Sequence, residues 1–475
     1  MPEKQTLVMK FGGTSVGSVD ALMKVTQIVK DARIEYARVV VITSAMSGVT
    51  NLLLDSASLA SQGKVDSLPK AESTLREKHF AAADALIMDE ELREATKSEI
   101  NSLIFSLIDL CKAIAVLGEA SPRVLDTVAS IGERMCIRLL GAILESAGVN
   151  AKAIESTGFI VTNAHFQHAH PDFKATTEKT RKLLNPLLEN NIIPVTTGFI
   201  GATSEGVITT LGRGGSDYSA AIIGAVLPAD DVWIWTDVDG IMTTDPRIVK
   251  GACTLSEITY SEVAELAYYG ANVLHPKTIR PVVDAGIGLR ICNTFNPSHP
   301  GTRLIANMPS DSQARNGQVV KAVTAIRNQR LVTIEGRGIL GVPGVAARAF
   351  GAVASTKTSV PLITQASSEQ SICFAVPSES AISVINALQA VFASEIEDED
   401  IDRVWMTEDV SIITVVGVGM RHTPGVAGQV FTQLGNNKAN VLAIAQGSSE
   451  VSISMVVAAV DTELAVRSLH ELIVK

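Results

Sequence analysis

The sequence is poor in cysteine and has no excess of positive charge. Its five cysteines are scattered over 475 residues without the paired spacing of a zinc motif or a disulfide framework. This usage is typical of a reduced compartment, so we expect a cytoplasmic protein. The 40 Lys and Arg residues against 50 Asp and Glu residues give a formal net charge of -10, so no overall field draws the chain onto nucleic acid or anionic lipid.

Long hydrophobic runs are also absent. No run reaches the roughly 18 apolar residues of a membrane-spanning helix, and the N-terminus mixes acid and base before a very short apolar run, so we expect neither an export signal nor a membrane anchor. Hydrophobic residues nevertheless make up 46% of the chain, as in folded globular proteins. The length exceeds that at which single cores stop growing, which predicts about two to four domains.

The first 300 residues alternate between short β-branched segments and helical patterns. This alternation predicts an α/β fold with a mostly parallel sheet. Residues 65–120 are charged and helix-prone without strand signals, so we expect a helical lobe there. The Pro-, Ser-, Asn- and Gly-rich stretch at residues 295–317 marks a domain boundary.

Beyond this boundary the sequence repeats itself. Pro343 matches Pro424 and Gln365 matches Gln446, with an offset of 81 positions in both pairs (424 − 343 and 446 − 365). Each copy follows the pattern strand, Pro-Gly turn, amphipathic helix, strand, turn, strand. We therefore predict a catalytic domain followed by two small α+β modules, with the boundaries 1–300, 319–398 and 405–475.

The stretch "KFGGTSV" at residues 10–16 lies between a short apolar run and a helical pattern. Its glycines let backbone N–H groups approach oxygen atoms, and the ammonium of Lys10 can meet charge that develops on a transferred phosphoryl group. The stretch is not a P-loop, because GxxxxGK(S/T) is absent from the chain. These residues favour a nucleotide site over a plain turn.

Two further stretches carry more polar groups than a turn needs. In "TTLGRGGSDYSAA" (209–221), glycines flank Arg213, whose guanidinium can hold a carboxylate or phosphate, and Ser216 or Asp217 can cap the next helix. The alternative is a capped turn with a surface arginine. In contrast, the histidines at 165, 168 and 170 match no zinc spacing, and we interpret them as a solvated loop.

The stretch "WTDVDGIMTTDPR" (235–247) is dense in aspartate and threonine. Such density is typical of contacts to nucleotide phosphates, ribose or magnesium. We favour that interpretation for Asp237 and Arg247. We interpret Asp239 and Gly240 as an Asp-Gly turn.

Taken in order, "KFGGTSV", "SAMSGVTN", "GER", "TTLGRGGSDYSAA", "WTDVDGIMTTDPR" and "YGANVLHPKTI" resemble the aspartate kinases of the amino acid kinase superfamily. The resemblance covers nearly the whole chain, and the duplicated modules resemble tandem ACT domains. It implies a three-layer αβα sandwich around a mostly parallel sheet, followed by two ferredoxin-like α+β ACT domains. It also implies ATP-dependent phosphorylation of the L-aspartate side chain to 4-phospho-L-aspartate, the first step toward lysine, threonine and methionine, with Mg2+ bridging the phosphates.

The resemblance further implies roles for individual residues. Lys10 would stabilise the transferring phosphoryl group, and Asp217 would orient Lys10 or the substrate. Arg213 would bind the α-carboxylate of aspartate and Glu133 the α-ammonium, with Thr50 and Ser216 completing the pocket. The residues implied to hold the nucleotide are Lys10, Phe11, Gly12, Gly13, Thr236, Asp237, Met242, Arg247 and Asn272. Many relatives have a lysine in place of Asn272 and a tyrosine in place of Met242, so we expect an altered nucleotide affinity.

Regulation is implied by the same resemblance. Pro361 stands where lysine-inhibited relatives commonly carry an aspartate, and the modules resemble those of threonine-sensitive members. We therefore expect threonine as the effector, contacted by Gln365 and Gln446, although both glutamines could simply cap loops. ACT modules usually pair edge to edge, so we expect a homodimer or a dimer of dimers. No dehydrogenase domain follows Lys475, so the chain is expected to be monofunctional.

Two alternatives stay open. The first is a related kinase that acts on glutamate, acetylglutamate or a nucleoside monophosphate; the ACT pair and "KFGGTSV" disfavour it. The second is a non-catalytic amino-acid-sensing regulator that kept the fold. The intact Lys10, Arg213 and Asp217 disfavour that reading.

Overall fold

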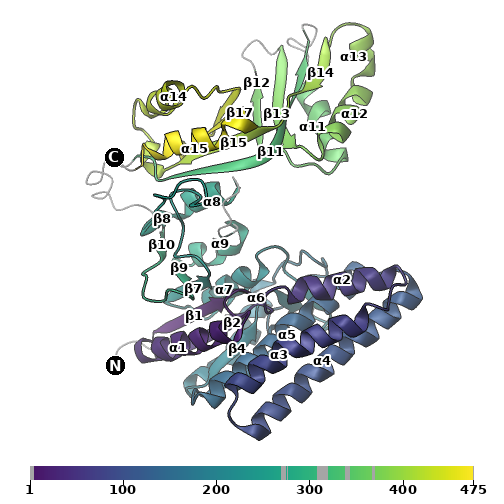
Figure 1. The fold of residues 1–475 in the computed structure, drawn as a ribbon, viewed down its shortest axis with the longest axis vertical. Helices are drawn as coiled ribbons and strands as arrows, with labels where there is room; N and C mark the ends of the chain where they lie inside the picture. Colours follow the sequence, from purple (N-terminus) through teal and green to yellow (C-terminus); the bar gives the residue numbers. More distant parts are fainter. Residues whose placement is uncertain are drawn as a thin grey trace. The chain divides into compact units, whose positions relative to one another are not determined.

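The computed structural model describes residues 5–268, 274, 276–306, 319–336, 343–365 and 370–473. The chain forms two compact units, Met1–Ile241 with Leu274–Ala306, and Met242–Val273 with Asn307–Lys475 (Figure 1). The stretch 242–273, which lies inside the expected domain of residues 1–300, groups with the C-terminal half of the chain.

The first unit is built on a mostly parallel sheet, as the alternating sequence pattern predicts. The strands are β1 (Thr6–Phe11), β2 (Arg38–Thr43), β3 (Ala151–Ile154), β4 (Ile193–Thr197), β7 (Asp231–Thr236), β9 (Gly288–Asn293) and β10 (Thr302–Ile305). Within this unit they lie in the order β3-β4-β2-β1-β7-β9-β10, and β10 is antiparallel to β9. All six residues of β1 are buried, because helices cover both faces of the sheet.

Helices on the two faces complete the three-layer sandwich (Figure 1). α1 (Val19–Glu35) and α5 (Pro122–Ser146) cover one face, and α6 (Phe173–Glu189), α7 (Gly215–Val226) and α9 (Pro276–Asp284) cover the other. Side chains cap two of these helices: Ser18 Oγ accepts a hydrogen bond from Ala21 N at 3.2 Å, and Asp172 Oδ1 accepts one from Ala175 N at 3.0 Å. The helix α7 begins after Gly214 without a side-chain cap, so the cap expected from Ser216 or Asp217 is not formed. β5 (Ile200–Ala202) and β6 (Ile208–Thr210) form a short separate hairpin, and a 3-10 turn covers Ser156–Gly158.

The predicted helical lobe is confirmed. It consists of α2 (Val49–Ser61), α3 (Leu68–Leu86) and α4 (Glu90–Leu117) packed beside α5. By length and composition alone α4 could cross a membrane. Its apolar face, however, is buried in the core of this unit, where Ile100, Ile104 and Leu107 are fully inaccessible to solvent.

The second unit contains the sequence duplication, and it confirms the predicted α+β modules. The first copy comprises β11 (Ala322–Glu335), α11 (Val345–Ser355), β12 (Leu362–Gln365), β13 (Ser371–Pro377), α12 (Ala381–Val391), α13 (Ala393–Glu397) and β14 (Arg403–Met406). The second copy comprises β15 (Val410–Val416), α14 (Val426–Asn436), β16 (Ala443–Gln446), β17 (Ser452–Ala458) and α15 (Thr462–His470), with 3-10 turns at Val418–Met420 and Ala459–Asp461. In both copies the Pro-Gly turn precedes a helix, with Gly344 at φ +91° and Gly425 at φ +86°.

The two copies share one antiparallel sheet in the order β12-β13-β11-β15-β17-β16, and β14 also pairs with β11. The long strand β11 makes this possible, because it pairs with β15 near its start and with β13 near its end. Each copy keeps its own apolar core under its helices.

Buried polar contacts tie residues 242–268 to the rest of this unit. The segment contains β8 (Glu257–Thr259) and α8 (Tyr260–Tyr268). The fully buried carboxylate of Glu262 accepts hydrogen bonds from Lys321 Nζ at 3.1 Å and from Val418 N at 2.7 Å. Thr243 Oγ1 lies 2.9 Å from His470 Nε2.

Candidate active site

A cavity of about 630 Å³ lies in the first unit at the carboxyl ends of β1 and β2. Loops that follow parallel strands meet at one edge of the sheet, which is where open α/β folds bind ligands. One face of α5, the start of α2 and the start of α7 close the cavity. Its lining includes Lys10, Gly13, Thr50, Asp126, Glu133, Phe199, Arg213, Ser216 and Asp217.

Lys10 and Asp217 form an ion pair in this cavity, with Lys10 Nζ 2.6 Å from Asp217 Oδ1. Their side chains are only 11% and 19% exposed. Asp217 stands in the first turn of α7, where a carboxylate is favoured by the helix dipole. An ammonium carries three donors, so Lys10 keeps donors for a second anion while Asp217 holds it in place.

The glycines after β1 bring the backbone close to neighbouring loops. Gly12 N donates a hydrogen bond to Trp235 O at 3.1 Å, and Ser47 N donates one to Gly13 O at 3.0 Å. A Cβ on Gly13 would lie 3.0 Å from Ala45 O, so a larger residue would displace this loop. The side chain of Phe11 is fully buried and stacks on Trp235 at 5.9 Å, so a contact of this residue to the nucleotide would have to come from its backbone.

Glu133 is the most strongly perturbed acid of the cavity. It lies on α5 with 3% of its surface exposed, and Oε1 accepts a hydrogen bond from Ala45 N at 3.2 Å. Oε2 is buried and has no hydrogen-bond partner among the described residues. Burial raises the pKa of this carboxyl to about 8. A buried oxygen without a donor is costly, and a cationic ligand group would satisfy it.

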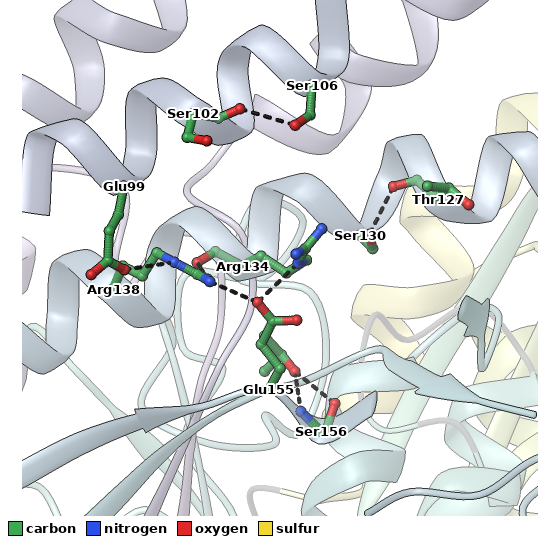
Figure 2. Close-up of polar contacts among 10 residues, drawn as sticks. Glu99, Ser102, Ser106, Thr127, Ser130, Arg134, Arg138, Glu155 and Ser156 are labelled. Atoms are coloured by element: carbon green, nitrogen blue, oxygen red, sulfur yellow. Dashed lines mark hydrogen bonds and ion pairs between the residues drawn. The ribbon is translucent and has the colours of Figure 1, made fainter. Parts of the chain in front are cut away.

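The residue after Glu133 belongs to a different network, which fixes the far side of α5 (Figure 2). Arg134 Nε lies 3.0 Å from Glu155 Oε1, and Arg138 bridges Glu155 and Glu99 at 2.8 and 3.0 Å. Burial alone would raise the pKa of the Glu155 carboxyl, but Arg138 and Arg134 outweigh it and hold the pKa below its usual value. The "GER" stretch therefore has both a cavity residue and a residue that anchors the helix.

Asp126 escaped the sequence analysis although it lines the same cavity. It lies seven residues before Glu133, hence on the same face of α5, and is 1% exposed. Its carboxylate accepts hydrogen bonds from Thr210 N at 2.9 Å, Thr210 Oγ1 at 2.8 Å and Gln167 N at 2.9 Å. Asp126 thus ties α5 to the loop of Gln167 and to the end of β6, which leads into the loop that bears Arg213.

Arg213 is exposed on that loop, between Gly212 at φ +79° and Gly214 at φ +71°. Among the described residues it forms no ion pair within 4.0 Å. His168, one of the three histidines interpreted as a solvated loop, is exposed but also lines the cavity. Thr50 and Ser216 are half-buried in the lining, at the starts of α2 and α7.

Phe199 is a second residue that sequence reasoning missed. It lines the cavity with a positive φ of 66°, a conformation that is strained for a phenylalanine. Its N–H donates to Ser219 Oγ at 3.0 Å, which holds this backbone conformation. A Cβ on the preceding residue, Gly198, would lie 2.7 Å from Ser216 Cβ, so no larger residue fits there.

The residues expected to hold the nucleotide are divided between the two units. Thr236 ends β7, and its Oγ1 donates to Asp237 Oδ1 at 3.2 Å. Met242 and Arg247 belong to the second unit, where the guanidinium of Arg247 is 88% exposed and lies 2.7 Å from Asp245. Asn272 lies outside the described residues. Asp239 Oδ1 accepts hydrogen bonds from Asn293 Nδ2 at 2.8 Å and from Asn296 Nδ2 at 3.0 Å, as expected for a residue that stabilises a turn.

The two candidate effector residues end corresponding strands of the duplicated modules. Gln365 is the last residue of β12 and Gln446 the last of β16, and both are exposed. No group of three or more His, Cys, Asp or Glu residues within the described parts of the chain could hold a metal ion.

Comparison with known proteins agrees with this architecture. Residues 5–293 match the amino acid kinase family, and residues 332–392 and 413–472 match the ACT domain. The lysine-sensitive aspartokinase 3 of Escherichia coli K12 is 34% identical over 469 residues, which are 98% of each chain. The chloroplastic bifunctional aspartokinase/homoserine dehydrogenase 2 of Arabidopsis thaliana is 36% identical over 98% of this chain. The chain spans about half the length, 50%, of that relative.

Solved structures show the same relationship. Escherichia coli aspartokinase III in complex with aspartate and ADP superposes with a TM-score of 0.79 at 32% identity, covering 99% of this chain and 100% of the other. Aspartate kinase of Clostridium acetobutylicum gives a TM-score of 0.79 at 27% identity, covering 98% of this chain. The matched residues, the mostly parallel sheet and the duplicated modules together show that the chain belongs to the amino acid kinase family and carries ACT domains.

Proposed function

We propose that the protein is an aspartate kinase, which transfers the γ-phosphoryl group of ATP to the side-chain carboxylate of L-aspartate. The observation that carries this proposal is the buried Oε2 of Glu133, which has no hydrogen-bond partner in the described part of the chain, in the cavity that also contains Arg213 and the Lys10–Asp217 pair. A buried carboxyl group and a guanidinium in one cavity suit the α-ammonium and α-carboxylate of an amino acid, because the bound ammonium would favour the ionised form of the carboxyl. Names of similar proteins, aspartokinases of bacteria and plants, support the choice of aspartate.

For this reaction the protein needs mainly to position the two substrates and to stabilise the charge on the transferring phosphoryl group. A carboxylate oxygen of aspartate attacks the γ-phosphorus, the bond from that phosphorus to the β,γ-bridging oxygen breaks, and ADP leaves. The attacking carboxylate is already ionised, so no general base is required. Lys10 stabilises charge on the transferring phosphoryl group, and Asp217 holds the ammonium of Lys10 in position.

ATP and Mg2+ fit the residues on this edge of the sheet. Magnesium usually binds one or two carboxylates together with substrate phosphates and waters, so it needs no cage of protein ligands. The exposed carboxylate of Asp237, beside Thr236 at the end of β7, is of that kind. The ion would neutralise phosphate charge when bound, while Gly12, Gly13, Thr236 and Asp237 would orient the nucleotide.

A substrate panel tests the proposal and separates it from the alternatives. The purified chain is assayed for ADP release with aspartate, glutamate, acetylglutamate and a nucleoside monophosphate, each with ATP and magnesium. Aspartate should give the highest kcat/KM, because Glu133 and Arg213 fix the distance from the α-carbon to Lys10. Turnover with another acceptor alone would identify a related kinase. Binding of amino acids without turnover of any acceptor would identify a regulator.

We further propose that threonine inhibits through the ACT modules, with Gln365 and Gln446 as contacts. Pro361 supports this, since it offers no counter-charge to a lysine effector. The relative from Escherichia coli is named lysine-sensitive, so both amino acids must be tested. Inhibition by threonine that is lost in Gln365→Ala and Gln446→Ala would support the proposal, and inhibition by lysine alone would contradict it.

Assembly and location complete the proposal. A homodimer or dimer of dimers through the ACT modules should appear in light scattering as two or four chains, and a monomer would contradict it. A cytoplasmic location suits the bacterial relatives, whereas the plant relatives are named chloroplastic. The product would serve as the first intermediate toward lysine, threonine and methionine.

A further inference from the structure

A second cavity, of about 580 Å³, adjoins the candidate active site within the first unit. The loop 168–170, the start of α6, the loop that bears Arg213, and helices α7 and α9 surround it. Arg213 and His168 line both cavities. Of the residues expected to hold the nucleotide, none that the structure describes lines this second cavity. We call it the Arg280 cavity, after the arginine on α9 in its wall.

The charged groups of the Arg280 cavity are mostly cationic. Among the described residues of the lining, Arg213, Lys277 and Arg280 are cations and Asp284 is the one acidic residue. Arg280 Nε lies 3.5 Å from Asp284 Oδ2, and both side chains are largely exposed, so this ion pair is weak. The imidazoles of His168 and His170 add hydrogen-bonding nitrogens. The lining thus carries an excess of positive charge around a concave space.

We propose that the Arg280 cavity binds a small, multiply charged anion with carboxylate or phosphate groups. Two guanidinium groups can each present a pair of N–H donors to such a group, which a lysine cannot do. The ring of Phe173 and the half-buried Tyr218 provide apolar walls beside the charges. This mixture of a few convergent polar groups and apolar surface is typical of small-molecule sites.

The shared residue Arg213 couples this site to the candidate active site. Its flanking glycines permit the loop to adopt more than one backbone conformation, and a guanidinium cannot offer the same pair of N–H donors to two anions at once. An anion in the Arg280 cavity therefore weakens the binding of aspartate, and aspartate weakens the anion by the same factor. This coupling rests on the proposed function, whereas the anion site itself does not.

Calorimetry on the full chain tests the site directly. Inorganic pyrophosphate and citrate are titrated separately, without magnesium and with saturating ADP to occupy the nucleotide site. The two probes distinguish a phosphate from a carboxylate ligand. We expect at least one probe to bind, and Arg280→Gln to weaken it by about fivefold or more, as for loss of one charge-assisted hydrogen bond. Asp284→Asn should strengthen binding, and Lys10→Ala should leave it unchanged.

Three results would overturn the anion site: no binding of either probe, equal binding in Arg280→Gln, or loss of binding in Lys10→Ala, which would locate the anion in the candidate active site. Thermal melting of Arg280→Gln shows whether the variant is folded; its exposed side chain predicts an unchanged Tm. If Arg280→Gln fails to fold, the rise in affinity of Asp284→Asn still decides the question.

The coupling has its own readout. In the wild type a bound probe should raise the KM for aspartate severalfold, and in Arg280→Gln the same concentration should have little effect. Arg280-dependent binding without any change in the KM for aspartate would overturn the coupling alone. Arg280-dependent binding by a chain that turns over no aspartate would overturn the proposed function and leave the anion site standing.

Discussion

Lys10 Nζ lies 2.6 Å from Asp217 Oδ1, and strand β1 and helix α7 supply the two partners. The pair is largely shielded from water, so its attraction is stronger than that of a surface ion pair. Each partner also fixes the other at the edge of the cavity. This geometry keeps the ammonium of Lys10 at the cavity, where it can contact a phosphoryl group.

The first prediction follows from that pair. Replacing Asp217 by Asn keeps the shape of the side chain but removes its charge, so the ammonium of Lys10 is held less firmly. We expect kcat to fall by about 10- to 100-fold, because small displacements of a catalytic group have effects of that size. Steady-state kinetics with saturating ATP and aspartate measures it. An unchanged kcat in Asp217→Asn would remove Asp217 from the mechanism.

The second prediction concerns the Glu133 carboxyl, whose pKa is raised to about 8 by burial. Below that pH the carboxyl is mostly neutral and cannot pair with the substrate ammonium. The KM for aspartate should therefore fall as the pH rises from 6.5 to 8.5, on the order of tenfold. In Glu133→Gln the KM should be higher and should vary much less with pH. The same slope in the variant and the wild type would assign the titration to another group.

The raised pKa has a consequence for stability as well. The pKa of this carboxyl is near its ordinary value of 4.5 in the unfolded chain but about 8 in the folded chain. The unfolded state therefore binds fewer protons between these values, and Glu133 makes the ligand-free protein less stable as the pH rises through this range. Glu133→Gln should lose that contribution. Thermal melting from pH 5 to pH 8 checks it.

The third prediction concerns Asp126, a positioning residue. Asp126→Ala leaves Thr210 N and Gln167 N without their acceptor, so the free energy of unfolding should fall by about 1–3 kcal/mol. The loop that bears Arg213 loses its anchor, so the KM for aspartate should rise on the order of tenfold while the KM for ATP changes little. Asp126→Asn keeps one acceptor oxygen, so its KM for aspartate should lie between those of the wild type and Asp126→Ala. Equal increases in both KM values would indicate a general loss of structure.

The fourth prediction concerns the network on the far side of α5 (Figure 2). Arg138→Met removes the bridge between Glu155 and Glu99 but keeps the apolar stem of the side chain. We expect a loss of about 0.5–1.5 kcal/mol in the free energy of unfolding, as for partly exposed ion pairs. Denaturant unfolding measures it, and 1 M salt should reduce the difference only in part, since Glu155 is half-buried.

Much of the fold could be predicted from the sequence, because its signals are local. Buried strands such as Val39–Ile42 read as short β-branched runs, since both faces of the sheet are covered. The repeated Pro-Gly turns at Gly344 and Gly425 reveal the duplication. The grouping of residues 242–273 with the ACT modules could not be predicted. It depends on hydrogen bonds between residues that are far apart in the sequence, such as Glu262 and Val418.

Some residues of the candidate site could likewise be predicted from the sequence, and others could not. Lys10 and Arg213 stand in glycine-rich stretches that point to a ligand, whereas Glu133 is expected only from the resemblance; the structure brings all three to one cavity. Asp126 resembles any polar residue of an amphipathic helix, and only its spacing of two turns from Glu133 could have suggested it. The side chain of Phe11 packs in the core, and the sequence of the stretch around it could not show which of its groups face the cavity.

One measurement tests the central claim most directly. Wild-type protein and Lys10→Ala are incubated with ATP, magnesium and L-aspartate, and the acyl phosphate is trapped with hydroxylamine as the hydroxamate. We predict hydroxamate formation by the wild type and a loss of roughly 10²–10³-fold or more in Lys10→Ala, the size expected when one transition-state contact is removed. No hydroxamate from the wild type, or equal rates in a folded Lys10→Ala, would contradict the account.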